Sequence, residues 1–306
     1  MSALAETWLI AFLLFSGLGV GSVGALAIGH LLMEEWVEHL EGVLGAMGRW
    51  IPLAALALAL PMYWLAPLLW PWATPGAAPS GWYLPGFVWV RSLLLLAVWA
   101  GLGWWLTANA TRRRGGIALL LLLPTAAIAM DDWALSRDEA WSGSVQGIAM
   151  VTGQVAGALS VALLLAGPPD TGIARTGISR ALLSLALAMV WLWFTQFIVV
   201  YGGNIPAEAA WYLRRSEGGW GMLKLGVTLP AALGAIVLGI LPQWRGWRFA
   251  IVSALLLLAL LSHLVWLVRP EAIPGATSLL LDAALLLPAS GITLALMHRA
   301  SRQSAR

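Results

Sequence analysis

Apolar stretches long enough to cross a lipid bilayer follow one another along almost the whole of this 306-residue chain. A transmembrane helix needs about 20 consecutive apolar residues, and it satisfies its own backbone hydrogen bonds in lipid. The sequence therefore predicts an all-α integral membrane protein, with residues 1–306 forming a single polytopic domain. The fourth span is the shortest, and it could extend as far as Trp133. We expect nine spans, at residues 7–31, 50–71, 84–107, 115–130, 143–167, 178–201, 220–241, 248–268 and 277–297.

The composition excludes several other classes of protein. Apolar residues make up 60% of the chain and charged residues only 10%, whereas a soluble domain carries about 25% charged residues. Cysteine is absent, which excludes iron–sulfur clusters, c-type haem attachment, disulfides and a cysteine nucleophile. The four histidines show no spacing typical of a zinc or haem site. We therefore expect this chain to bind no metal and no redox cofactor, and to contact membrane lipid but no nucleic acid.

Arginines in the short loops predict the orientation, because basic residues favour the cytoplasmic side. Eleven lie after odd-numbered spans or in the C-terminal segment: Arg49, Arg112, Arg113, Arg114, Arg175, Arg180, Arg245, Arg248, Arg299, Arg302 and Arg306. Five lie on the opposite side: Arg91, Arg137, Arg214, Arg215 and Arg269. We therefore expect the N-terminus outside and the C-terminus in the cytoplasm. A signal peptide is not expected, because the first seven residues carry Glu6 and no basic residue.

Two further features suggest contact with the membrane surface. Many of the twenty tryptophans lie near predicted span ends, which is typical of an interfacial belt: Trp8, Trp70, Trp72, Trp82, Trp133, Trp141, Trp220, Trp244 and Trp247. Residues 32–49 place apolar side chains on one stripe and four glutamates elsewhere, which suggests an interfacial helix. We interpret its acidic face as a solvated surface or a partner contact, in preference to a proton-collecting surface.

Ionisable residues inside the spans are informative, because each is costly in hydrocarbon unless it is paired or hydrated. Arg91, Lys224, His263 and Asp282 all lie about four to seven residues from the outer ends of their spans, roughly 6–10 Å deep. They could meet at one level. The simplest arrangement is a Lys224–Asp282 ion pair with His263 beside it as the titratable group. The alternative is that Lys224 and Arg91 extend outward to the headgroups and that Asp282 has a structural partner.

The cytoplasmic half of the spans carries fewer polar groups. His30 lies at the inner end of the first span, Gln154 is near mid-depth on the fifth, and Gln196 is on the sixth. No continuous row of carboxylates crosses the bilayer. The sequence therefore favours a polar half-channel from the outside over a complete proton pathway.

Three stretches resemble one family of membrane subunits. Residues 132–147 read DWALSRDEAWSGSVQG and resemble its pattern D-W-x-x-S-x-D-P-x-W-x-S-T-x-x-G. Residues 193–208 read WFTQFIVVYGGNIPAE and are similar to its stretch W-F-S-Q-Y…W-Y-x-N-I-P-E-E, and Tyr212-Leu-Arg-Arg215 follows. Gly29-His30-Leu31 followed by Trp36 resembles H-H-L…W. On these residues the chain resembles the ActF-like (second NrfD-like) membrane subunits of alternative complex III, within the polysulfide-reductase membrane-anchor superfamily.

The resemblance implies an NrfD-like helical bundle in a bacterial inner membrane, without redox cofactors of its own. Its implied partners are a homologous quinol-binding NrfD-like subunit and subunits that carry iron–sulfur clusters and haem c. The subunit would support assembly of a quinol:electron-acceptor oxidoreductase, without being its catalytic subunit, and could hold a proton half-channel. Asp132, Asp138 and Asp282 match carboxylates of the family, whereas Gly29 replaces its first histidine and Ser262-His263 stand where an aspartate is expected.

Two other functions stay open at the level of sequence. The chain could itself bind quinol, with Asp132, Asp138 or His263 as the polar groups of the pocket. It could also be a solute transporter. The sequence disfavours a transporter, because it shows no pair of Gly/Pro-broken spans at matching positions in two halves.

Overall fold

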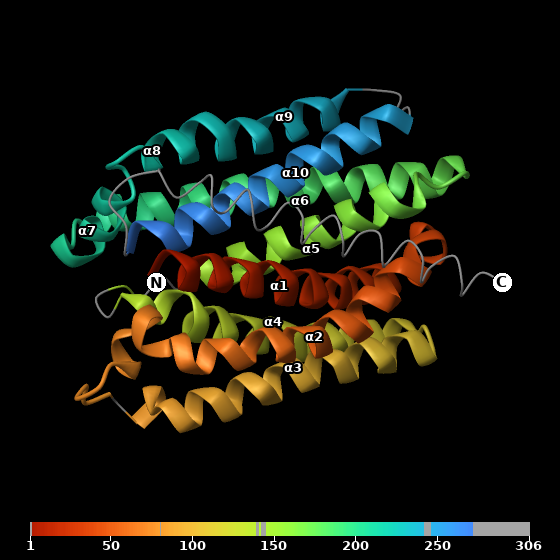
Figure 1. Cartoon of the computed structure of the whole chain (residues 1–306). Helices are drawn as coiled ribbons and strands as arrows, with labels where there is room; N and C mark the ends of the chain where they lie inside the picture. The colour runs from red at the N-terminus through yellow and green to blue at the C-terminus, as the bar shows by residue number, and fades with distance from the viewer. Residues whose placement is uncertain (1, 80, 139–140, 142–144, 242–245, 272–306) are drawn as a thin grey trace.

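The computed structural model describes residues 2–79, 81–138, 141, 145–241 and 246–271, and Figure 1 shows its helices running along one common direction. The long helices are α1 (Ser2–Leu32), α2 (Trp36–Leu69), α3 (Pro85–Ala108), α4 (Arg112–Trp133), α5 (Gln146–Ala166), α6 (Gly172–Gly203), α9 (Leu229–Ile240) and α10 (Gly246–Val268). The shorter elements are η1 (Pro71–Ala73), η2 (Gly81–Tyr83), η3 (Leu135–Arg137), α7 (Pro206–Arg214), α8 (Trp220–Leu223), the π-helical turn η4 (Lys224–Thr228) and η5 (Arg269–Glu271).

The predicted all-α membrane fold is confirmed. Within the described part of the chain, eight helical segments are long and apolar enough to cross a membrane. One of them, Trp220–Ile240, joins α8, η4 and α9 into a single span. The fourth span does reach Trp133, as the sequence allowed. The predicted ninth span, residues 277–297, lies outside the described residues.

The eight spans form two groups of four. In the first group α1 packs against α2, α3 and α4, and α3 also packs against α2 and α4. In the second group α5 packs against α6 and α10, and α9 packs against the same two helices. Contacts of α1 and α4 with α5 join the groups, and their buried side chains form one continuous apolar core. Because each group contains four antiparallel spans, α1 and α5 both begin at the same end of the bundle.

The expected interfacial helix at residues 32–49 is wrong. After a short turn at Met33, which has a positive φ of 57°, α2 starts at Trp36 and runs unbroken to Leu69. Apolar residues such as Leu40 and Leu44 are fully buried in the bundle rather than facing lipid headgroups. The amphipathic stripe of this segment therefore packs on neighbouring helices, and the stripe alone could not distinguish that surface from a membrane.

Close helix contacts depend on glycines of the first span. A Cβ atom built on Gly21 would lie 2.0 Å from the backbone oxygen of Gln154 on α5. Similarly, a Cβ on Gly103 of α3 would lie 2.4 Å from the backbone oxygen of Gly48 on α2. Small residues that let backbones approach this closely are typical of helix packing in membranes. Gly21 therefore lets α1 and α5 pack closely, and Gly103 does the same for α3 and α2.

The predicted tryptophan belt is only partly correct. Trp82 and Trp247 are about half exposed, as an interfacial residue would be. However, Trp70, Trp72, Trp133, Trp141 and Trp220 are almost fully buried, at no more than 5% exposed. Trp244 lies outside the described residues. Position near a span end therefore does not show whether an indole faces lipid or the interior of the bundle.

Candidate functional site

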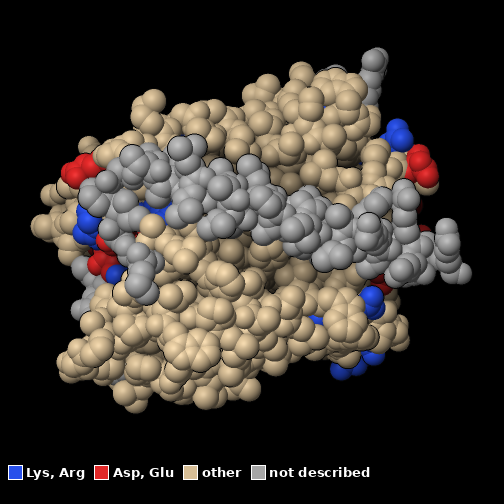
Figure 2. Space-filling model, in the orientation of Figure 1, with Lys and Arg blue, Asp and Glu red and all other residues tan. Residues whose placement is uncertain are grey.

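Polar and charged side chains gather at the end of the bundle where α1 begins, which we call the polar end. It is the left side of Figure 2, where blue and red atoms lie close together. Its arginines are the five that the sequence analysis assigned to the outer loops, and each forms an ion pair. The pairs are Arg91–Asp132, Arg137–Glu6, Arg214–Asp138, Arg215–Glu271 and Arg269–Glu6.

The most buried of these pairs involve Glu6, in the second turn of α1. Its side chain is fully buried between Arg137 and Arg269, which are themselves 7% and 0% exposed. Arg137 also donates to the backbone oxygens of Val268 and Leu69, at 2.6 and 3.2 Å. This network connects the start of α1, the loop after α4 and the end of α10. Sequence reasoning missed it, because Glu6 was considered only as evidence against a signal peptide and both arginines as loop residues.

Arg91 on α3 binds Asp132 on α4 through two hydrogen bonds, Nε to Oδ2 at 2.7 Å and Nη2 to Oδ1 at 2.6 Å. The guanidinium also lies 4.0 Å from the centre of the Trp82 ring. Next to this pair, the Tyr83 hydroxyl donates to Asp131 at 2.8 Å. Burial and this hydrogen bond raise the pKa of the Tyr83 phenol. Arg91 therefore does not extend to the headgroups, and it does not join Lys224 either.

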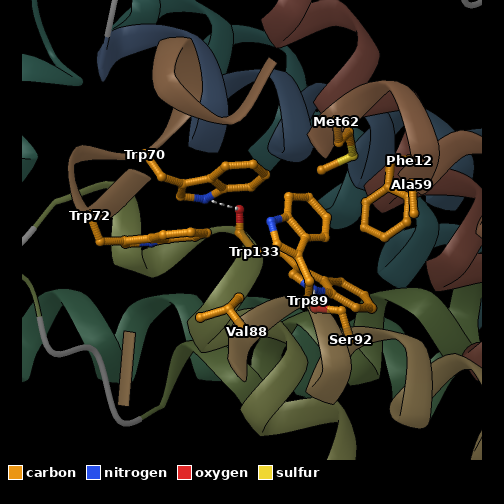
Figure 3. Close-up of a pocket in the computed structure, with 9 residues that line it drawn as sticks. All are labelled: Phe12, Ala59, Met62, Trp70, Trp72, Val88, Trp89, Ser92 and Trp133. Carbon is orange, nitrogen blue, oxygen red and sulfur yellow. Dashed lines mark hydrogen bonds between the residues drawn. The ribbon is translucent and has the colours of Figure 1, made fainter. Parts of the chain in front are cut away.

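An aromatic layer lies beside the Arg91–Asp132 pair (Figure 3). The Trp70 indole donates to the backbone oxygen of Trp133 at 3.2 Å, and the Trp133 indole donates to Ser92 at 2.8 Å. Trp70 and Trp72 stack with their ring centres 5.3 Å apart. The cavity that these rings enclose measures only about 10 Å³, enough for one water molecule. The layer is therefore a packed, hydrogen-bonded wall.

A second network joins residues 138–141 to α7 and to the end of α10. Asp138, from the first stretch, pairs with Arg214, which follows the second. Trp141 stacks on Trp211, with ring centres 4.2 Å apart and planes 11° apart. Arg215 pairs with Glu271, and its guanidinium lies 3.6 Å from the centre of the Trp211 ring. Burial lowers the pKa of Arg215 to about 10, and Glu271 opposes the shift, so Arg215 stays charged at neutral pH.

Lys224 and His263 are in contact, which agrees with the first of the two arrangements that the sequence allowed. Lys224 stands at the first position of the π-helical turn η4, and its Nζ lies 3.0 Å from His263 Nδ1 on α10. The amine also lies 3.6 Å from the centre of the Trp193 ring and 4.9 Å from that of Trp266. Tryptophan faces attract cations, so the two rings stabilise the ammonium. The predicted partner Asp282 lies outside the described residues.

The imidazole of His263 has a polar partner on each side. Its Nδ1 lies 3.0 Å from Lys224 Nζ, and which of the two donates depends on the ring tautomer. Its Nε2 lies 3.4 Å from Gln146 Nε2, while the buried Oε1 of Gln146 has no hydrogen-bond partner among the described residues. Gln146, which the sequence analysis did not select, is therefore the second partner of the imidazole.

The remaining predicted site residues do not join this cluster. Gln154 lies on α5 against α1 and α4, where its Nε2 lies 3.7 Å from the sulfur of Met130. Gln196 is buried on α6, and its Nε2 has no hydrogen-bond partner. His30 is buried near the end of α1, at the opposite end of the bundle. These three residues do not form a continuous path with Lys224 and His263.

Two cavities among the described residues are smaller than a typical pocket for a drug-sized ligand, which measures about 300 Å³ or more. The larger of the two, between α1, α4, α5 and α6, measures about 100 Å³ and has almost entirely apolar walls. Among the described residues, no group of three or more His, Asp or Glu side chains could hold a metal ion. The ion pairs of the polar end and the Lys224–His263 contact are suited to charge pairing and proton exchange.

No protein-family model matches the chain, and the search of curated proteins gave no match. Function therefore has to be inferred from the residues and their geometry.

Proposed function

We propose that the chain is a cofactor-free membrane subunit of a bacterial quinol:electron-acceptor oxidoreductase, of the type found in alternative complex III. It supports assembly, and its Lys224–His263 cluster serves as a proton half-channel. The observation that carries the proposal is that Asp138 and Trp141, from the first family-like stretch, contact Arg214 and Trp211, which follow the second. Quinol binding is assigned to the homologous partner subunit, as the resemblance implies.

In this proposal the polar end faces the periplasm. All five arginines at that end pair with carboxylates, so their charge is largely neutralised. By contrast, none of the ion pairs among the described residues includes the six at the opposite end: Arg49, Arg112, Arg113, Arg114, Arg175 and Arg180. Unneutralised positive charge favours the cytoplasmic side. A periplasmic N-terminus follows, and reporter fusions after Ala3 and after Arg306 should report opposite sides.

The subunit assignment is tested by purifying the tagged chain from its native membrane. We expect subunits with haem c and iron–sulfur clusters to co-purify in fixed ratio, together with quinol oxidation by the assembly. The chain expressed alone should show no haem absorbance. Purification of the chain without redox partners, or with a stoichiometric haem of its own, would contradict the proposal.

The proton role follows from the position of His263 between two partners. An imidazole with one nitrogen facing Lys224 and the other facing Gln146 can take up a proton on one side and release one on the other. Removing it with His263→Ala should reduce the protons released or taken up per electron, while the subunit ratio of the assembled complex stays unchanged. Gln196→Leu is the matched control, because Gln196 is buried in the same group of helices outside the cluster. Unchanged proton stoichiometry in His263→Ala would remove the proton role.

A further inference from the structure

At the end of the bundle opposite the polar end, four arginines lie on neighbouring helices without acidic partners. Arg49 is on α2, and Arg112, Arg113 and Arg114 form the first turn of α4, close to the end of α3. None of them takes part in the ion pairs formed by the described residues. Figure 2 shows blue atoms at the lower right, where α3 ends and α4 begins in Figure 1. This corner therefore carries a concentrated positive charge.

The Arg49 side chain is positioned by two contacts and still has donors that make no hydrogen bond. Its Nη1 donates to the Thr107 hydroxyl at 3.2 Å, and its guanidinium lies 5.1 Å from the centre of the Trp104 ring. Its Nε is buried and has no hydrogen-bond partner. Trp50 packs edge-on against Trp104, and the two rings are 57% and 47% exposed. Exposed indoles beside an arginine mark the level of lipid headgroups.

The three arginines of α4 have different roles. Arg114 donates to the backbone oxygens of Trp105 and Asn109, at 2.8 and 3.2 Å, and so caps the end of α3. Arg112 and Arg113 are exposed at the start of a 22-residue helix. The positive end of the helix dipole adds to their charge, and anions bind favourably at such a position. Arg112 and Arg113 are therefore available to an external anion.

We propose that this corner binds the headgroup of an anionic phospholipid, with phosphate oxygens accepting from Arg49, Arg112 and Arg113. Arginine is well suited to this, since its guanidinium binds phosphate through two parallel hydrogen bonds. Lipid is favoured over free phosphate because the site opens onto an apolar face. Exposed Leu53 and Leu60 of α2 and Leu94 and Val98 of α3 can contact the acyl chains. A basic pocket between spans is a known setting for such headgroups.

The site is tested with the full-length chain, delipidated in mild detergent. Binding of phosphatidylglycerol, cardiolipin and phosphatidylethanolamine is measured by native mass spectrometry and by the rise in the thermal midpoint. We expect the two anionic lipids to bind at least tenfold more tightly than phosphatidylethanolamine. The double variant Arg49→Gln/Arg113→Gln should lose most of that preference. Arg175→Gln/Arg180→Gln, which removes the same charge from α6 at the same end, should keep it.

Several results would overturn the site. The first is equal binding of all three lipids by the wild type, and the second is an equal loss of the preference for anionic lipids in both double variants. The third is competition by inorganic phosphate at the same concentration as the lipid, which would indicate a site for free phosphate. If Arg49→Gln/Arg113→Gln does not fold, Arg113→Glu replaces it, because Arg113 is exposed. That variant should also bind the anionic lipids at least tenfold more weakly. The proposal is independent of the proton role.

Discussion

The substitution Glu6→Gln tests whether the buried network at the start of α1 stabilises the protein. It removes the carboxylate that pairs with both Arg137 and Arg269, which are themselves almost fully buried. Breaking a buried pair by removing one partner costs about 3–5 kcal/mol, because the other charge is left uncompensated. Here both guanidiniums lose the Glu6 carboxylate, although both keep backbone oxygens as acceptors. We therefore expect the free energy of unfolding to fall by about 3–5 kcal/mol.

The measurement is denaturant unfolding in a fixed detergent, followed by tryptophan fluorescence. Glu35→Gln is the matched control: it makes the same change at an exposed site before α2, where we expect less than about 0.5 kcal/mol. A second variant, Glu6→Gln combined with Arg137→Met, should recover part of the loss, because it removes one uncompensated charge. If Glu6→Gln is no less stable than Glu35→Gln, the network does not contribute to stability and the reasoning is refuted.

Two further predictions concern packing and titration. Gly21→Ala should destabilise the protein by about 1–3 kcal/mol, because its Cβ would lie 2.0 Å from the backbone oxygen of Gln154. The control Gly42→Ala should be neutral or stabilising, because a Cβ there has no atom within 4 Å. Equal effects of the two substitutions in thermal unfolding would contradict the close approach of α1 and α5. The pKa of the Tyr83 phenol is raised in the folded state, so above about pH 10 the unfolded chain loses this proton while the folded protein keeps it. The contribution of the protonated phenol to the stability of the folded state is therefore complete below about pH 10 and is lost as the pH rises further. The advantage in thermal midpoint of the wild type over Tyr83→Phe should therefore be constant up to about pH 10 and shrink above it, and a constant advantage at higher pH would speak against the shift.

The sequence predicted the spans well because hydropathy is a local property. Each described span contains a continuous apolar run, and the length of that run is set by the bilayer. The exception was α2, whose first turns carry the glutamates expected on an interfacial helix. Its apolar stripe packs on the bundle, and only the neighbouring helices determine which surface such a stripe covers.

The site was predicted less completely, because its contacts join distant parts of the chain. Lys224 and His263 could be paired from their matched depth on consecutive spans, and the structure confirms that contact. Arg91 has the same depth, yet it pairs with Asp132 inside the first group of helices. Depth alone does not show which helices face each other. Gln146 was missed for the same reason, since its partner lies 117 residues away.

The ion pair between Glu6 and Arg269 has a consequence for how the protein is made. The two residues are 263 positions apart, so at about 5–20 residues per second Arg269 is synthesised roughly 13–50 s after Glu6. During that interval α1 must enter the membrane with its carboxylate lacking a final partner. A glutamate near the end of a span can meet this need by staying at the water interface. In that case α1 reaches its final depth in the membrane only after the end of α10 has been synthesised. The start of the chain is then among the last parts of the protein to adopt its final position.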